Sequence, residues 1–314
     1  MSAINQQMIY YATASGTGKW YGSRGCFGGG YSGSTENEID YVAIDTTGDA
    51  TDFGDLTQSR QAISGTSNGT RGMFMGGCNA SGSPYDRTDY ITVGTLADAT
   101  DFGDPTVDRS NGGGVSDGNY AIHSGGSSGG AYATGTDTID YYTIAITGDA
   151  TNFGDLLFTI ACSQGAVNDA TRGVIAGGFA ASNSNVVDTI QYITMATTGD
   201  ATDFGDLTSA TANMGGGVDN SVRGVVHYGS GAGVPTIEYI TIATTGDATN
   251  FGNLTQKRKE SGGCNNQTRG IWGGGKDNSA EDIIDYITID TTGDATDFGD
   301  LTQSKQSISA CSGT

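Results

Sequence analysis

The chain has 314 residues, of which 35 are acidic and 14 are lysine or arginine, so its formal net charge at pH 7 is −21. So acidic a chain is not expected to follow the phosphates of a nucleic acid, and it has no apolar run of the roughly 18 residues needed for membrane insertion. The 53 glycines, 3 prolines and 15 tyrosines favour short β-strands joined by tight turns.

Residues 1–23 precede the repeated part of the chain and form an N-terminal extension. Its sequence begins MSAINQQMIYYATASG, which lacks the basic segment and the long apolar run of a secretory signal. The extension predicts either an extra strand laid on the repeats or an anchor to a partner. Its aromatic residues Trp20 and Tyr21 are therefore candidates for partner contact.

Six copies of one unit follow, with a core close to IDYITIATTGDATDFGDLT. Its tyrosine recurs at intervals of 47 to 51 residues, and a phenylalanine stands 12 residues after each tyrosine. The tyrosines are Tyr41, Tyr90, Tyr141, Tyr192, Tyr239 and Tyr286. A second element, RGxxxGG, precedes each core and begins at Arg24 in the first copy. Self-similarity at this period is typical of repeat architectures.

Each unit has room for four short strands. The first is the RGxxxGG element, the second is centred on DYITI, the third is DATDFGDL, and the fourth is a polar stretch such as QAISGTS. Gly, Asn and Asp separate these segments, as expected at turns. No window shows the sustained 3.6-residue periodicity of an amphipathic helix, so the sequence predicts an all-β fold.

The phase of the repeat indicates a closed ring. The chain enters its first unit at Arg24 and ends with LTQSKQSISACSGT, which matches residues 56–69. The C-terminal segment thus supplies the fourth strand that the N-terminal unit lacks, and a ring closed in this way has no exposed sheet edges. Residues 24–314 are therefore predicted to form a six-bladed β-propeller of four-stranded blades. The alternative, a β-solenoid, usually has shorter repeats and atypical end repeats.

Acidic residues recur in the GDATDFGD segment, in the first copy at Asp49, Asp52 and Asp55. Calcium binding is one interpretation, because Ca²⁺ takes carboxylate ligands from turns. Calcium loops usually place ligands at alternate positions, whereas these residues are three apart, and the fifth copy keeps only one carboxylate. The other interpretation is turn shaping through side-chain-to-backbone hydrogen bonds, which requires no metal.

The arginine of RGxxxGG is present in five of the six units, and the third unit has Tyr120 in its place. One hypothesis places this arginine on a recognition surface. The other has it bond a carboxylate or carbonyls of the neighbouring blade, and repetition around a ring favours this structural role. The acidic residue before each repeat tyrosine, such as Asp40, is the partner that the structural hypothesis suggests.

The five cysteines are odd in number and form no CxxC pair. Cys264 and Cys311 fall at a repeat position that Val218 occupies in another unit, which predicts a small buried site rather than a disulfide framework. The two histidines, His123 and His227, lie in non-adjacent units, so a shared metal is not expected. No motif for a nucleophile, a zinc protease or a phosphate loop occurs, and no catalytic residue or cofactor is predicted.

Binding is expected where the copies of a near-symmetric ring differ. The second unit carries SGSPYDRT, which contains Tyr85, and the third unit combines Tyr120 with the loop GGSSGGAYATGT, which contains Tyr132. Small polar loops that bear tyrosine suit recognition of a protein or a glycan. Tyr85, Tyr120 and Tyr132 therefore join Trp20 and Tyr21 as predicted partner-binding residues.

Two features of the repeat carry a family resemblance. A four-stranded unit of about 50 residues with a Gly-Gly doublet, an aromatic pair and a basic residue after the third strand resembles the kelch repeat. Kelch repeats usually have Trp soon after the Tyr, whereas here Phe follows 12 residues later. The basic position holds Arg60, Arg109, Arg258 and Lys305, with Ile160 and Thr211 in the other two units. The fuller string, IDYITIATTGDATDFGDLT followed by TRGxxxGG, is similar to repeats of virion structural and tail-fibre-type proteins of marine bacteriophages, cyanophages especially.

This resemblance implies a non-enzymatic phage virion structural protein, in a host-contacting appendage such as a tail fibre or as a capsid decoration. The expected partners are other virion proteins and a host-surface protein or glycan, in a larger assembly put together in the host cytoplasm. The alternative is a bacterial extracellular or cell-surface adhesion module, which needs an export route that residues 1–23 do not indicate. An enzyme on a propeller scaffold is a third hypothesis, and no catalytic motif supports it.

Overall fold

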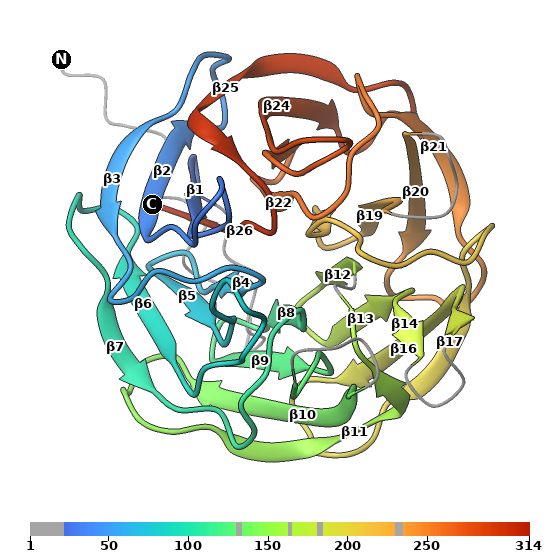
Figure 1. The fold of residues 1–314 in the computed structure, drawn as a ribbon. Helices are drawn as coiled ribbons and strands as arrows, with labels where there is room; N and C mark the ends of the chain where they lie inside the picture. Colours follow the sequence, from blue (N-terminus) through green and yellow to red (C-terminus); the bar gives the residue numbers. More distant parts are fainter. Residues whose placement is uncertain (1–21, 130–133, 163–164, 181–184, 230–234) are drawn as a thin grey trace, which may run out of the picture.

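The computed structural model describes residues 22–129, 134–162, 165–180, 185–229 and 235–314. Over these ranges the chain forms β-strands and no helix. Six sheets stand as blades around a central axis, and each blade has four antiparallel strands (Figure 1). The chain is therefore a six-bladed β-propeller, as the phase of the repeat predicted.

The blades are numbered in chain order, and their strands are given from the axis outward. Blade 1 contains β26 (Ser309–Gly313), β1 (Arg24–Gly28), β2 (Glu38–Ala43) and β3 (Thr51–Asp55). Blade 2 contains β4 (Ser64–Ser67), β5 (Arg71–Met75), β6 (Thr88–Thr92) and β7 (Thr100–Gly103). Blade 3 contains β8 (Gly113–Ser116), β9 (Tyr120–Ser124), β10 (Thr136–Thr143) and β11 (Thr151–Ile160). Its sheet is extended by β14 (Phe179–Ala180) and β15 (Asn185–Val186).

The remaining three blades repeat this plan. Blade 4 contains β12 (Gly165–Asn168), β13 (Arg172–Ala176), β16 (Thr189–Thr194) and β17 (Thr202–Asp206). Blade 5 contains β18 (Val218–Asp219), β19 (Arg223–His227), β20 (Thr236–Thr241) and β21 (Thr249–Asn253). Blade 6 contains β22 (Gly262–Asn265), β23 (Arg269–Gly273), β24 (Glu281–Thr288) and β25 (Thr296–Lys305).

The two ends of the described chain close the ring in blade 1. The C-terminal strand β26 pairs antiparallel with β1, and Cys311 lies opposite Cys26. Outside the strands, Tyr31 and Gln306 exchange two backbone hydrogen bonds of 2.8 and 3.0 Å. The C-terminal segment therefore completes the N-terminal blade, which confirms the circular offset inferred from the sequence.

The spacing of 12 residues between the repeat Tyr and Phe follows from the pairing of the two outer strands. Tyr41 on β2 lies opposite Thr51 on β3, which places Phe53 beside the Tyr41 ring. The two rings meet edge to face, with centroids 5.7–6.2 Å apart in all six blades. Phe53 is buried although the rest of its strand is largely exposed, so this pair supplies the outer part of the core.

The backbone conformation explains why glycine occupies the third position of Asp-Phe-Gly-Asp. Gly54 has φ of +144° at an irregularity where the β2–β3 register shifts. A Cβ on Gly54 would lie 2.8 Å from the Ala97 carbonyl carbon of the neighbouring blade. Both the backbone angle and the close approach of two blades therefore require glycine at this position.

The glycine that follows the repeat arginine has a different role, because a neighbouring blade packs against it. At Gly270 an added Cβ would lie 2.4 Å from Val218 Cγ2 of the preceding blade's inner strand. Equivalent contacts place Val167 over Gly224, Cys264 over Gly25 and Cys311 over Gly72. The inner strand of one blade thus fills the space that the missing side chain leaves in the next blade.

Gly270→Ala is therefore expected to lower the free energy of unfolding by about 1–3 kcal/mol through overpacking. Urea denaturation followed by tryptophan fluorescence would measure the change. The double variant Val218→Ala/Gly270→Ala should recover part of the loss, because the smaller side chain makes room for the new methyl group. Losses that simply add in the double variant would contradict this contact.

Candidate functional site

Four buried ion pairs join successive blades. A basic residue after the outer strand of one blade contacts the carboxylate before the repeat tyrosine of the next blade, with N–O distances of 2.7–3.0 Å. The pairs are Arg60–Asp89, Arg109–Asp140, Arg258–Asp285 and Lys305–Asp40, and all eight side chains are 0% exposed. The basic position after the third strand therefore joins adjacent blades at these four junctions and is buried away from any ligand.

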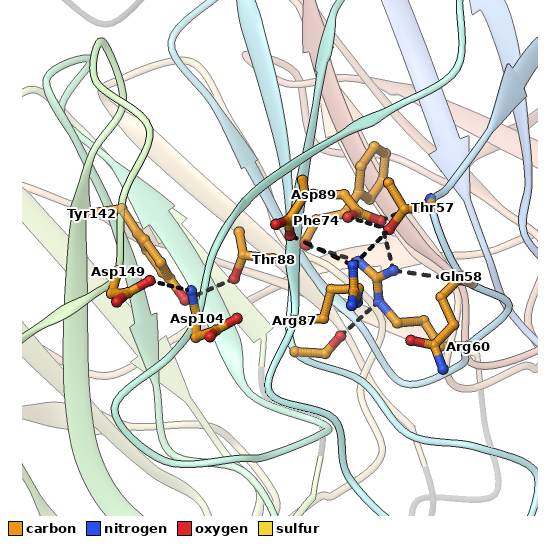
Figure 2. A network of polar contacts seen from close by, with 12 residues as sticks. Thr57, Gln58, Arg60, Phe74, Arg87, Thr88, Asp89, Asp104, Tyr142 and Asp149 are labelled. Atoms are coloured by element: carbon orange, nitrogen blue, oxygen red, sulfur yellow. Dashed lines mark hydrogen bonds and ion pairs between the residues drawn. The ribbon is translucent and has the colours of Figure 1, made fainter.

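The junction of blades 1 and 2 shows how such a pair is satisfied (Figure 2). Arg60 donates hydrogen bonds from Nη1 to Asp89, from Nε to the Gly76 carbonyl and from Nη2 to the Phe74 carbonyl, at 2.7, 2.9 and 3.1 Å. Asp89 also accepts hydrogen bonds from the Thr57 hydroxyl at 2.6 Å and the Thr57 amide at 3.1 Å. Removal from water lowers the pKa of Arg60, and the Asp89 carboxylate opposes that shift.

At the two junctions without a basic residue, the residue at the acidic position of the next blade also differs. At the junction of blades 3 and 4, Ile160 stands at the basic position, and neutral Gln191 replaces the acid and accepts a bond from the Leu157 amide at 2.9 Å. At the junction of blades 4 and 5, Thr211 stands at the basic position, and Glu238 replaces the aspartate and keeps the hydrogen bond from the threonine hydroxyl, here that of Thr208. The acidic position has thus changed at both junctions, to a neutral amide at one and to a longer carboxylate side chain at the other.

The arginine of RGxxxGG also joins blades, in a different way. Its guanidinium lies over the repeat tyrosine of its own blade at 4.3–4.7 Å from the ring centroid. It donates to a backbone carbonyl of the next blade at 2.7–3.3 Å, as Arg24 does to Val93 and Arg269 to Ile44. The predicted bond to a neighbouring carbonyl is confirmed. The predicted bond to Asp40 and its equivalents is wrong, because those carboxylates pair with the buried basic residues described above.

The first aspartate of each GDATDFGD segment bonds a neighbouring blade. Asp49 Oδ1 accepts a hydrogen bond from the Asp300 amide at 3.2 Å, and Asp98 accepts one from the Asp55 amide at 3.1 Å. The same bond occurs at all six junctions. The side-chain-to-backbone bonds expected of these residues are present, but they cross between blades. Among the described residues no group of three or more His, Cys, Asp or Glu side chains is arranged to hold a metal.

These bonds bring carboxylates of adjacent blades close together along the outer rim. At Asp206, reduced hydration followed by repulsion from Asp188, Asp247 and Asp203 raises the pKa above its usual value. The pKa values of Asp55, Asp104, Asp155 and Asp300 are raised for the same two reasons. Because the folded chain holds these protons more tightly than the unfolded chain, ionisation of the rim destabilises the fold.

Asp206→Asn is expected to raise the melting temperature at pH 7 and low salt by about a degree or more, because it removes one repelling charge. The fifth blade provides the model: Asn253 makes the same backbone bond to Asp294 and adds a side-chain bond of 3.2 Å. The gain should shrink in high salt. It should also vanish as the pH falls below the unfolded pKa of about 3.9, where the wild-type carboxyl is neutral too. A gain that is unchanged by salt and pH would contradict the charge argument.

Both histidines are enclosed in the fold. His123 Nε2 lies 3.0 Å from Ser64 Oγ, and His227 lies 2.6 Å from Ser261 Oγ and 3.0 Å from the Tyr228 carbonyl. Burial, followed by the nearby Arg258, lowers the pKa of His227 to about 3, and burial with Arg109 lowers the pKa of His123. A serine beside such a weak base, with both side chains buried, lacks the geometry expected of an accessible nucleophile.

The cysteines agree with the packing role predicted for them. Cys26, Cys78, Cys162, Cys264 and Cys311 are all buried and free. Burial raises the pKa of Cys78 and of Cys264, and it raises the pKa of Cys162 to about 12. The thiols therefore act as small apolar side chains at the blade contacts.

The predicted partner-binding residues are not gathered at one site. Tyr85 is half-buried in the loop between β5 and β6, whereas Tyr120 is half-buried at the start of β9. These positions lie at opposite ends of equivalent strands, so the two residues are on opposite faces of the ring. Tyr132, Trp20 and Tyr21 lie outside the described residues.

The face that carries Tyr120 has further blade-specific side chains that the sequence analysis did not single out. The Tyr120 ring packs edge to face on Tyr141, with centroids 5.2 Å apart, where other blades have an arginine. In the turns between the outer strands, Leu96 of blade 2 is 53% exposed and Ile146 of blade 3 is 69% exposed. The signal was available, because both residues replace threonine of the TTGD turn.

The axis of the propeller is nearly closed by glycine. A Cβ on Gly65 would lie 2.2 Å from the Ala310 carbonyl oxygen, and one on Gly217 would lie 2.3 Å from the Ala166 oxygen. A small recess of about 80 Å³ remains where the inner strands begin, lined mainly by Gly, Ala and Ser with Glu260 at its side. Its lining offers backbone and hydroxyl groups but few charges.

Comparisons with known proteins add no relationship to this geometry. No protein-family model matches the chain, and no curated protein matches it. The described part of the chain has no helix long and apolar enough to cross a membrane.

Proposed function

We propose that the chain is a non-enzymatic structural protein of a bacteriophage virion, placed in a host-contacting appendage or on the capsid as a decoration. The observation that carries this proposal is that repeated and blade-specific side chains have different roles. Charged residues repeated around the ring form bonds between blades, whereas Leu96 and Ile146, which distinguish blades 2 and 3, are exposed on one face. The amino-acid sequence of the repeat is similar to repeats of phage virion proteins, and this similarity supports the assignment to a virion.

The face that carries Tyr120, Leu96 and Ile146 is the surface that we assign to virion partners. Apolar and aromatic side chains gathered on the turns of neighbouring blades suit protein contact, since exposed apolar groups on an acidic protein gain most from being covered. Tyr85 on the opposite face remains the candidate for a host protein or glycan.

Immunogold electron microscopy of intact particles that carry this gene tests the proposal. Gold on tail fibres supports the appendage form, and gold over the head supports the decoration form. Particles without gold, although the protein is present in the lysate, would overturn the virion assignment and favour an adhesion module.

A matched variant tests the assigned face. Leu96→Thr/Ile146→Thr restores the threonine that most other copies have at these two positions. It should leave the melting temperature unchanged while it reduces incorporation into particles. Equal incorporation of the variant and the wild type would move the contact to another face.

A further inference from the structure

The junction of blades 6 and 1 differs chemically from the other buried ion pairs. Its cation is a lysine, Lys305, whereas the other three pairs use arginine. Lys305 Nζ lies 3.0 Å from Asp40 Oδ2 and 3.0 Å from Oε2 of a second carboxylate, Glu38. No other blade has an acid at the position of Glu38; the equivalents are Arg87, Thr138, Thr189, Thr236 and Ile283.

The Lys305–Asp40 pair is buried, whereas Glu38 beside it is partly exposed to solvent. The side chains of Lys305 and Asp40 are 0% exposed, and that of Glu38 is 32% exposed. The Thr302 hydroxyl donates a hydrogen bond of 2.6 Å to Asp40 Oδ1 and fixes the carboxyl group. Within the described residues neither Lys305 Nζ nor Asp40 Oδ2 makes a hydrogen bond of regular geometry. An amine therefore lies against a carboxyl group that is held in place, with a second carboxylate touching the same nitrogen.

We propose that Lys305 and Asp40 condense to an isopeptide bond that closes the ring covalently, with Glu38 as the catalytic proton carrier. Glu38 takes a proton from Lys305, and the neutral amine attacks Asp40 Cγ to form the N–C bond. Glu38 then delivers this proton to the departing hydroxyl of the Asp40 carboxyl, the C–O bond breaks, and one water leaves past the exposed edge of Glu38. The new amide nitrogen gives its second proton to the Glu38 carboxylate, which releases it to solvent. An amine and a carboxylic acid thus become an amide and water, without any oxidant or reductant.

Two physical features favour this reaction. The fold holds the nitrogen and the carboxyl group in contact distance, which replaces the entropy cost of a bimolecular encounter. Burial raises the pKa of the Asp40 carboxyl although the Lys305 ammonium opposes the rise, and this favours the neutral acid that an amine can attack. Arginine at the other junctions cannot react in this way at ordinary pH, because its guanidinium stays charged.

The proposed bond lies where the two ends of the chain meet in the ring. At all six junctions the polypeptide runs from the outer strand of one blade into the inner strand of the next, and β25 continues into β26 in this way. The break in the polypeptide lies inside blade 1, where β26 and β1 come from opposite ends of the described chain and pair through hydrogen bonds. An isopeptide bond between β25 and β2 would join these two ends of the chain covalently.

Intact-mass spectrometry of the purified full chain tests the proposal directly. The expected mass is about 18 Da below the sequence mass, the loss of one water that amide formation requires. Fragmentation of a tryptic digest should recover the Lys305 and Asp40 peptides as one linked species. Wild-type protein at its full sequence mass, even after several days at 37 °C, would overturn the proposal.

Two variants separate this bond from other losses of water. Lys305→Arg reproduces the ion pair of the other junctions and should fold with its full sequence mass. Glu38→Gln should also keep its full mass, because the proton carrier is lost while Lys305 and Asp40 remain. A loss of about 18 Da that persists in Lys305→Arg would overturn the bond, and one that forms at the wild-type rate in Glu38→Gln would overturn the role of Glu38.

Discussion

Deletion of residues 309–314 is expected to abolish cooperative unfolding of the whole ring. These residues include the inner strand β26, which pairs with β1 and packs between β4 and β22 of the neighbouring blades. Without this strand the backbone edge of β1 is unpaired, and buried Cys26 and Phe27 lose their cover. Thermal unfolding by circular dichroism should lose its sharp transition, and a dye for exposed apolar surface should bind at 25 °C.

A permuted chain provides the control for this deletion. Moving residues 309–314 to a position directly before Gly22 keeps every strand and places β26 beside β1 through a short turn, as β4 precedes β5 in blade 2. This chain should regain a cooperative transition. If the truncated chain unfolds as sharply as the full chain, closure by β26 is not what holds the ring together.

Breaking one buried ion pair should have the second-largest effect. Asp89→Ala leaves the Arg60 guanidinium buried without its carboxylate, and the expected cost is about 3–5 kcal/mol of the free energy of unfolding. Urea denaturation at pH 7 would measure it. The loss is expected to be large because both side chains are 0% exposed, so water does not replace the missing partner.

The chain itself supplies the matched control. The triple variant Thr57→Leu/Arg60→Ile/Asp89→Gln copies the junction formed by Leu157, Ile160 and Gln191 between blades 3 and 4. Its cost should be far smaller than that of Asp89→Ala, because an apolar side chain and a neutral amide replace both charges together. Equal losses in the two variants would show that the position, and not the unpaired charge, determines stability.

The architecture could be predicted from the sequence because the repeat defines both a period and a phase. The match of residues 301–314 to residues 56–69 indicated the closing strand, and β26 pairs with β1 as that match required. The Tyr and Phe spacing likewise anticipated the outer strands. These features are local or periodic, and a linear sequence expresses them directly.

The contacts between blades could be predicted only in part. Asp40 and its equivalents were assigned to the arginine of RGxxxGG, yet they pair with the other basic position of the repeat. Four of the six units contain both cations, and spacing alone does not say which one faces the acid of the next blade. The neutral pair of Ile160 with Gln191 was the available signal, because a missing cation coincides with a missing acid.

The glycines show a second limit of sequence analysis. Gly54 has a positive φ at an irregularity within β3, whereas Gly270 lies in β23 without a positive φ. Glycine is required at position 270 because the Val218 side chain of another blade occupies the space that a Cβ would need. Such a requirement depends on distance across the ring and leaves no local pattern in the chain.

Closure by pairing of β1 with β26 also sets the geometry of attachment. Arg24 lies opposite Gly313, so residues 22 and 314 leave the ring side by side on one face. A domain fused directly at residue 22 or at residue 314 would therefore begin on that same side. The opposite side carries the loops between second and third strands, including Tyr85, and would point away from the fused domain. The same surface therefore faces outward whichever end is used for attachment.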